Sequence, residues 1–299
     1  MRLVHVDTGR EMRGGQRQVL LLLNGLRDAG EECVLLARAG SPLFKIASES
    51  GRMVHPATLA NLWRHSKQAD LVHAHDAHAH THAALVSRVP FVVSRRVAFP
   101  LKRSVLSHWK YRRAARFLAV SEFVATQLAL ANIPKDKIDV IHDAVASFAG
   151  AGKWCADSPA VALASTDPAK GRDLVEQAAR LASLPVKYSN DLAADLARAS
   201  MFVYLTRSEG FGSAALLAMA MGIPVIASAV GGLPEALGDA GLLVANDPPQ
   251  ISAAMRRLRE DSALARTLIE RGKKRVAEQF TAQLMLERTM QAYRSALAL

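Results

Sequence analysis

Residues 201–220 read MFVYLTRSEGFGSAALLAMA, and residues 221–237 continue as MGIPVIASAVGGLPEAL. A short apolar run ends in a polar turn with one acid and two glycines, and an Ala- and Leu-rich segment follows. This order predicts a strand, a tight turn and a helix. The pattern repeats at once, because the run IPVIAS ends at Gly231 and Gly232 before a second helical segment. Glycine allows close approach of a ligand to the backbone, and the N–H groups at a helix start attract anions. We therefore expect a phosphate-binding turn before Ser213.

The same alternation of apolar runs and amphipathic stretches extends along the chain. Strands are expected within residues 3–7, 33–37, 71–75, 91–94, 117–121, 138–142, 160–165, 184–188, 201–206, 223–228 and 241–246. These runs are apolar throughout, as in parallel strands covered on both faces. Helices between them indicate right-handed crossovers. The sequence predicts an α/β protein with two Rossmann-like domains, whose parallel sheets face a central cleft where ligands bind.

A linker divides the predicted domains. Residues 144–159 are rich in Ala, Gly and Ser and show no periodicity. We expect an N-terminal domain over residues 1–146 and a C-terminal domain over residues 155–280. A last helix over residues 281–299 is expected to pack back toward the N-terminal domain. The linker and the change in charge disfavour one large doubly wound domain.

Composition and charge exclude several classes of protein. The chain has 299 residues, of which half are hydrophobic and 22% are charged, so it is neither disordered nor collagen-like. Residues 1–150 hold 21 of the 38 lysines and arginines but only 12 of the 27 acidic residues. That half is expected to face something anionic. The two cysteines, far apart, indicate a reduced, cytoplasmic protein.

No membrane span is expected. The apolar run at the N-terminus is too short for a signal peptide. Residues 211–233 carry no charge and are numerous enough to cross a bilayer. However, Gly222, Pro224 and the Gly231–Gly232 pair interrupt the run, which favours a helix, a turn and a strand inside an α/β core.

Several motifs together resemble the family 4 glycosyltransferases, which have the GT-B fold. In the second half these are SEGFG, LLAMAMGIPVIASAVGGLPEAL, AGLLV and DPAKGRDLVEQA. In the first half they are Gly14-Gly15, DLVHAH, PFVVSRR, LAVSEFVATQL and IDVIHDAV. The resemblance covers nearly the whole chain in the family's order.

The resemblance implies a nucleotide-sugar donor and a glycan or lipid-linked acceptor. It makes residues 1–146 the acceptor-side domain and residues 155–280 the nucleotide-sugar-binding domain. Lys170 would be directed to the diphosphate and Glu209 would lie near the sugar hydroxyls, and these two are the candidate catalytic residues. Donor contacts are expected from Gly14, Gly15, Ser208, Gly210, Phe211, Gly212, Ser213, Ala214 and Gly232. Such enzymes transfer the sugar with retention of configuration and usually without a bound metal, so no cofactor is expected. Lysine and helix-terminus amides would neutralise the leaving diphosphate.

Some positions depart from the family pattern. Leu217 stands where a second glutamate holds the ribose, and Ser165 stands where an arginine serves the diphosphate. One strand–helix unit of the second domain is absent. Arg96 replaces a histidine, and Asp143-Ala144 replaces an Asn-Gly turn. These departures keep a second hypothesis open, a non-catalytic GT-B protein that binds glycan, membrane or a partner enzyme. A sugar-nucleotide epimerase is a third, for which no acid–base pair is assigned.

Five histidines crowd residues 73–82, HAHDAHAHTH. His78 and His82 have the helical spacing of a metal site. Without cysteine or a second acidic cluster nearby, no metal site is predicted, and the histidines are expected to meet sugar hydroxyls or water. His75 and Asp76, together with Arg95 and Arg96, are the expected acceptor-side contacts.

Residues 95–116 hold eight basic side chains and no acid, with Phe99, Trp109 and Tyr111 among them. This composition fits a basic amphipathic helix on an anionic membrane surface, at the inner face of the plasma membrane, and an ordinary solvated helix face is the alternative. The resemblance favours the membrane, because related enzymes often act there on lipid-linked acceptors. Nucleic acid is not expected as a partner, since no base-reading motif accompanies the patch.

Overall fold

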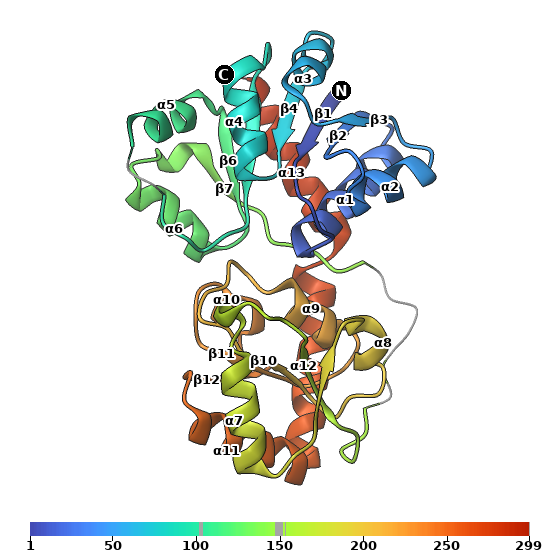
Figure 1. Ribbon diagram of the computed structural model, residues 1–299, viewed down its shortest axis with the longest axis vertical. Coiled ribbons are helices and arrows are strands. Elements are labelled where there is room, and N and C mark those ends of the chain that lie inside the picture. The colour runs from blue at the N-terminus through green and yellow to red at the C-terminus, as the bar shows by residue number, and fades with distance from the viewer. Residues whose placement is uncertain (102–103, 147–151, 153, 299) are drawn as a thin grey trace. The chain divides into compact units, whose positions relative to one another are not determined.

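The computed structural model describes residues 1–101, 104–146, 152 and 154–298. The chain forms two compact units: residues 1–143 with 282–299, and residues 144–281. Each unit contains one parallel sheet flanked by helices (Figure 1). The α/β class and the two Rossmann-like sheets predicted from the sequence are therefore confirmed.

The first unit holds a seven-stranded parallel sheet of order β3-β2-β1-β4-β5-β6-β7. Its strands are β1 (Arg2–Asp7), β2 (Glu32–Ala37), β3 (Val54–Pro56), β4 (Leu71–Ala74), β5 (Phe91–Arg95), β6 (Arg116–Ala119) and β7 (Ile138–Val140). The helices between them are α1 (Gly14–Asp28), α2 (Pro42–Glu49), α3 (Leu59–Ser66), α4 (Ala77–Val86), α5 (Val105–Arg113) and α6 (Glu122–Leu130), with a 3₁₀ turn at Lys135–Lys137. The strand order reverses between β1 and β4, which is where ligands bind in such sheets.

The second unit holds a five-stranded parallel sheet of order β12-β11-β10-β8-β9. Its strands are β8 (Ala160–Leu163), β9 (Val186–Ser189), β10 (Phe202–Tyr204), β11 (Val225–Ser228) and β12 (Leu242–Val244). Its helices are η2 (Pro168–Lys170, 3₁₀), α7 (Arg172–Ala182), α8 (Leu192–Leu196), α9 (Ser213–Ala220), α10 (Leu233–Leu237), α11 (Pro248–Glu260) and α12 (Ser262–Gln279). The chain passes from β9 through α8 directly to β10. The sequence lacks one strand–helix unit of the family pattern in this region, and the direct path from β9 through α8 to β10 agrees with that.

Local sequence explains where the elements begin. Ser41, Thr58, Asp76 and Ser121 each precede a helix, and each side chain accepts a hydrogen bond from a backbone N–H of the first turn. The central strands are apolar and buried, as expected when helices cover both faces. The edge strand β3 was not predicted, because its three residues are only partly buried and form no apolar run.

The helix α13 (Ala282–Leu297) belongs to the first unit. It packs against α1, β5 and β6, and Figure 1 shows it in red beside α1. Tyr293 of α13 is fully buried. The two ends of the second unit meet, because the N–H of Val145 donates to the carbonyl oxygen of Phe280, 3.0 Å away. Residues 144–146 thus join the second unit in the structure.

The uncharged stretch 211–233 forms α9, a turn at Gly222 and the buried strand β11. The helix–turn–strand interpretation is confirmed. Among the described residues, every helix is too short or too polar to span a bilayer.

Candidate functional site

A glycine-rich loop joins β10 to α9. Gly212 is the N-cap of α9 and has a φ of 105°, and a Cβ atom there would lie 2.6 Å from Leu233 Cδ2. Only glycine fits this backbone conformation and this space. The first N–H groups of a helix have no partner within it, so the helix start can receive an anion.

The second glycine turn supports the first. Gly231 has a φ of 58°, and a Cβ atom on it would lie 2.0 Å from the carbonyl oxygen of Glu209. A Cβ atom on Gly232 would lie 2.2 Å from the carbonyl oxygen of Gly210. The N–H of Gly232 donates to the Glu209 carbonyl at 3.2 Å. The two turns therefore form one surface, which requires glycine at both positions.

Glu209 is the centre of a small polar cluster. Its Oε2 atom lies 2.9 Å from Nζ of Lys170, at the end of η2. The same oxygen accepts a hydrogen bond from the Tyr204 hydroxyl, and Oε1 accepts one from the N–H of Gly210 at 3.0 Å. Burial, and then the charge of Glu209, hold the pKa of Tyr204 well above its ordinary value, so this hydroxyl keeps its proton and donates. The two predicted catalytic residues are in direct contact.

Beneath the loop lies a network that the sequence reasoning missed. The Thr206 hydroxyl donates to the carbonyl oxygens of Ala169 and Ser208, at 2.9 and 3.0 Å. The N–H of Thr206 donates to Ser228 Oγ, and Ser228 Oγ donates to Asn246 Oδ1. The network fixes the loop to η2, β11 and the end of β12, so it positions Lys170 and Glu209. Isolated Thr, Ser and Asn residues at strand ends carry no distinctive motif.

The structure places the predicted donor contacts Phe211 and Ser213 differently. The Phe211 side chain is 1% exposed and packs edge-on against Phe280, with ring centroids 5.3 Å apart, so it belongs to the core. Ser213 is the first residue of α9 and does not cap it, because Gly212 takes that position and no side chain caps the helix. Ser208, Gly210 and Ala214 lie in or beside the loop.

A groove of the second unit lies apart from this cluster. It encloses about 660 Å³ between the β8–α7 loop and Arg207. Ser165 lines it, whereas Lys170 and Glu209 do not. Arg207 closes one side by a bidentate pair with Asp173, at 2.7 and 3.2 Å. We assign the candidate site to the Glu209 cluster, because a lysine ammonium, a carboxylate and the start of α9 converge there.

In the first unit, Gly14 and Gly15 begin α1 after β1. Gln16 ties this start to the strand, because its Nε2 donates to both Asp7 carboxylate oxygens at 3.1 Å. Burial, and then the neighbouring Asp76, raise the pKa of Asp7. A Cβ atom on Gly15 would lie 3.8 Å from Cδ of Arg96, so the helix start and this arginine are neighbours.

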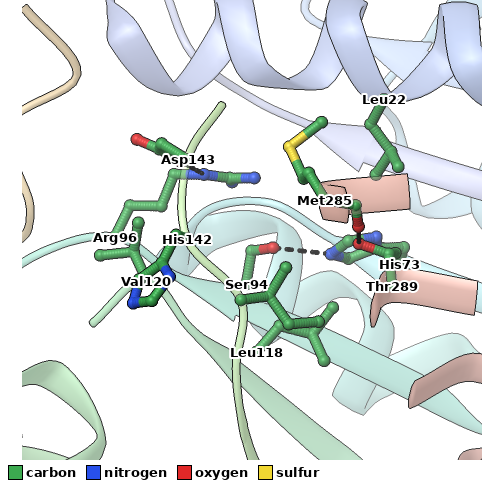
Figure 2. Close-up of a pocket in the computed structure, with 11 residues that line it drawn as sticks. Leu22, His73, Ser94, Arg96, Leu118, Val120, His142, Asp143, Met285 and Thr289 are labelled. Carbon is green, nitrogen blue, oxygen red and sulfur yellow. Dashed lines mark hydrogen bonds and ion pairs between the residues drawn. The ribbon is translucent and has the colours of Figure 1, made fainter. Parts of the chain in front are cut away.

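Arg96 reaches a small pocket of the first unit (Figure 2). Its Nε atom donates to Asp143 Oδ1 at 3.3 Å, and both side chains are largely buried. Among the described residues, its buried Nη1 atom has no hydrogen-bond partner. In the same pocket Ser94 Oγ lies 2.8 Å from His73 Nε2 (Figure 2). Of the predicted acceptor-side residues, Arg96 is the one that lines this pocket.

The other three expected acceptor contacts are engaged in structural roles. The His75 side chain is buried, and its Nε2 atom lies 2.9 Å from Nδ1 of His5. Asp76 caps α4 and also accepts hydrogen bonds from Thr8. Arg95 donates to the Tyr111 hydroxyl at 3.2 Å and to the carbonyl oxygen of Phe99. Asp76 therefore caps a helix, and His75 and Arg95 make contacts within the first unit.

The histidine run does not form one cluster. His78 is exposed on α4 and His82 is half-buried. His80 is buried among Phe91, Tyr111 and Phe117, and its Nε2 atom lies 3.1 Å from the carbonyl oxygen of Lys110. His73 and His75 are instead buried beside His5 of β1, with ring centroids 5.4 and 5.2 Å from that of His5.

The described basic residues of the stretch 95–116 fall into two groups, those with partners inside the first unit and those exposed on α5. Arg116 forms a bidentate pair with Asp139, at 2.6 and 2.8 Å, and Lys110 donates to Thr81 and to the Ala77 carbonyl. Arg112 and Arg113 of α5 are exposed, beside Trp109, which is 38% exposed. Phe99 is 62% exposed. Lys102 and Arg103 lie outside the described residues.

Two family models match this chain. The model described as "Glycosyltransferase Family 4" matches residues 12–146, and the model described as "Glycosyl transferases group 1" matches residues 126–261. Together they span the loop around Glu209 and the start of α1.

The chain is also similar to characterised proteins. It is 39% identical over 105 residues to the O-antigen chain mannosyltransferase B of Escherichia coli. It is 35% identical over 112 residues to the MMP alpha-(1->4)-mannosyltransferase of Mycolicibacterium hassiacum. These matches cover 35% and 36% of this chain, and 27% of each relative. The Anabaena protein HepE in complex with UDP-glucose has the same fold, with a TM-score of 0.86 over 100% of both chains at 16% identity.

Proposed function

We propose that this chain, which matches two glycosyltransferase family models and has the fold of a protein solved with UDP-glucose, transfers a sugar from a nucleotide-sugar to a hydroxyl of an envelope glycan or lipid-linked acceptor. The observation that carries this proposal is the contact between Lys170 and Glu209 at the glycine turn before α9. It joins a cation, a hydroxyl-binding carboxylate and a helix start, the groups that a sugar diphosphate needs.

The reaction breaks the bond between the anomeric carbon and the diphosphate oxygen. Lys170 and the first amides of α9 stabilise the negative charge that develops on that oxygen. Glu209 accepts hydrogen bonds from the sugar hydroxyls. The acceptor oxygen attacks the anomeric carbon on the face that the diphosphate leaves, and its proton passes to the departing phosphate oxygen. This course retains the anomeric configuration and requires no metal cofactor.

The acceptor is proposed to bind the first unit near Arg96. Its guanidinium is held by Asp143, and a buried Nη1 remains to donate to a phosphate or a carboxylate. Mannosyltransferase relatives support an envelope glycan as the acceptor class, since one is named for the O-antigen chain.

Calorimetric titration tests the donor site. A panel of nucleoside diphosphates and nucleotide-sugars is titrated into the wild-type chain, and at least one is expected to bind below millimolar concentration. Lys170→Ala is expected to weaken the binding of the nucleoside diphosphate about tenfold or more, because it removes a charge-assisted hydrogen bond. Lys187→Ala is the matched control, since Lys187 pairs with Asp195 on the surface. Failure of every compound to bind at millimolar concentration would overturn the proposal.

Retention is tested on the product. The anomeric coupling constants of donor and product, measured by NMR, are expected to report the same configuration. An inverted product would contradict the proposed course while leaving transferase activity intact.

An anionic membrane surface is proposed as a further partner, at the inner face of the plasma membrane. Exposed Arg112 and Arg113 lie beside half-exposed Trp109, a combination suited to acidic head groups and the interface. Co-sedimentation with anionic vesicles is expected to exceed that with neutral vesicles and to fall in the Arg112→Glu, Arg113→Glu variant. Lys274→Glu on α12, whose lysine is equally exposed, is the control. Equal sedimentation with both vesicle types would refute the proposal.

A non-catalytic GT-B protein is the second candidate. Leu217 and Ser165 favour it, because a leucine and a serine stand where the family carries ribose- and diphosphate-binding side chains. Tight glycan binding together with no nucleotide binding would select it.

A further inference from the structure

Three buried histidines converge inside the first unit. His5 lies on β1, and His73 and the residue after β4, His75, come from the adjacent strand. Their exposed fractions are 0%, 1% and 6%. One ring nitrogen of each lies within 4.8 Å of those of the other two, and within the described residues this is the one such group of potential metal ligands.

We propose that His5, His73 and His75 form a binding site for a divalent transition-metal ion, with zinc as the ion that best suits three imidazoles. Imidazole nitrogen is a preferred ligand of zinc, at about 2.0–2.1 Å. Two such ligands in a tetrahedral site are separated by about 3.3 Å. His5 Nδ1 and His75 Nε2 are 2.9 Å apart, so they already nearly have this separation. The third nitrogen has to approach by no more than about 1.5 Å.

Hydrogen bonding alone does not account for the cluster. A neutral imidazole has one donor and one acceptor nitrogen. Whichever ring donates in the His5–His75 contact, the outer nitrogens, His5 Nε2 and His75 Nδ1, are left as one buried N–H and one buried lone pair. Neither has a partner among the described residues. Buried polar atoms are almost always satisfied, so hydrogen bonds among the described residues leave this pair incompletely satisfied.

Three imidazole ligands leave the net charge of the ion in place and a fourth coordination position for water.

Neighbouring groups hold His73 in orientation. Its Nδ1 atom lies 2.6 Å from the Tyr293 hydroxyl of α13, and its Nε2 atom lies 2.8 Å from Ser94 Oγ of β5. A ligating His73 would give up one of these contacts and keep the other, as ligating histidines normally do. Of the three histidines, His73 is the one that lines the pocket of Figure 2. Binding would tie β1 and β4 together at the point where the strand order reverses.

The test uses the full chain without a polyhistidine tag. After chelator treatment and dialysis against Zn²⁺, elemental analysis is expected to find one zinc ion per chain. Co²⁺ in its place is expected to give the intense visible bands of a four-coordinate ion. X-ray absorption of the zinc form is expected to show nitrogen neighbours at about 2.0–2.1 Å.

Variants assign the site to these residues. His5→Gln and His75→Gln are each expected to abolish the stoichiometric zinc and the cobalt bands. The double variant His78→Gln, His82→Gln on α4 is the control and is expected to keep both. No retained zinc in the wild-type chain, or binding lost in the α4 variant instead, would overturn the proposal. The absorption measurement needs no variant, so sulfur neighbours or a six-oxygen shell would overturn it even if His5→Gln failed to fold. Nucleotide binding is a separate readout and is unaffected by this result.

Discussion

Nζ of Lys170 lies 2.9 Å from Oε2 of Glu209, although the two residues are 39 positions apart in the sequence. Both side chains are partly buried, at 31% and 15% exposure. A diphosphate that reaches this lysine must compete with Glu209 for its ammonium group. The Tyr204 hydroxyl on the same carboxylate oxygen keeps Glu209 in place during that exchange.

Tyr204→Phe is expected to reduce sugar transfer about tenfold while changing nucleoside diphosphate affinity little. The variant removes one hydrogen bond to a charged group, worth about 1.5–3 kcal/mol, and leaves the packing against Phe202. Turnover and calorimetric affinity measured on the same preparation check this. Unchanged turnover would show that Lys170 and Gly210 suffice to orient Glu209.

Leu217→Glu is expected to tighten nucleotide-sugar binding about tenfold, because it returns an acceptor for the ribose hydroxyls at the position where the family carries one. Leu217 is half-buried on α9, so a carboxylate there can reach solvent or ligand. Leu181→Glu on α7, 54% exposed, is the control leucine. Affinity that stays the same in both variants would mean that the nucleoside binds elsewhere.

Gly231→Ala is expected to destabilise the second unit by at least about 3 kcal/mol and to abolish nucleotide binding. The reason is steric, since the added Cβ would meet the Glu209 carbonyl at 2.0 Å. Gly40→Ala separates backbone strain from contact, because Gly40 also has a positive φ, 75°, but has open space around it. Its cost should be about 1 kcal/mol. Equal losses in thermal unfolding would argue against the close packing of the two turns.

Acid is expected to destabilise the first unit through His80. Burial lowers its pKa to about 3, below the ordinary value of 6.5. The unfolded chain therefore binds this proton before the folded chain does, so stability is complete above pH 6.5 and falls as the pH drops toward 3. The contribution of His80 to this loss is about 1.4 kcal/mol for each pH unit in that window. The buried His5, His73 and His75 contribute in the same direction, so His80→Gln should reduce the slope of unfolding free energy against pH by about that amount, and His78→Gln, at an exposed position, should leave it unchanged.

The sequence by itself determined the alternation of strands and helices, apart from β3, the two parallel sheets and the resemblance to the family 4 glycosyltransferases. Those features follow from local periodicity, as in IPVIAS, and from short motifs such as SEGFG, which keep their meaning without any knowledge of distant residues. The resemblance also named Lys170 and Glu209 as candidates, and the structure places the two side chains in contact.

Only the tertiary structure decided which polar side chains work together. His5 and His75 are 70 positions apart, and they meet because β1 and β4 are adjacent in the sheet. Asp76 and Arg95 were expected at a ligand, and in the structure Asp76 caps α4 and the half-buried Arg95 donates to Tyr111 of α5. Thr206, Ser228 and Asn246 carry no motif, yet they fix the loop of Glu209. Hydrogen bonds across a sheet depend on strand order and register, which local sequence patterns do not encode.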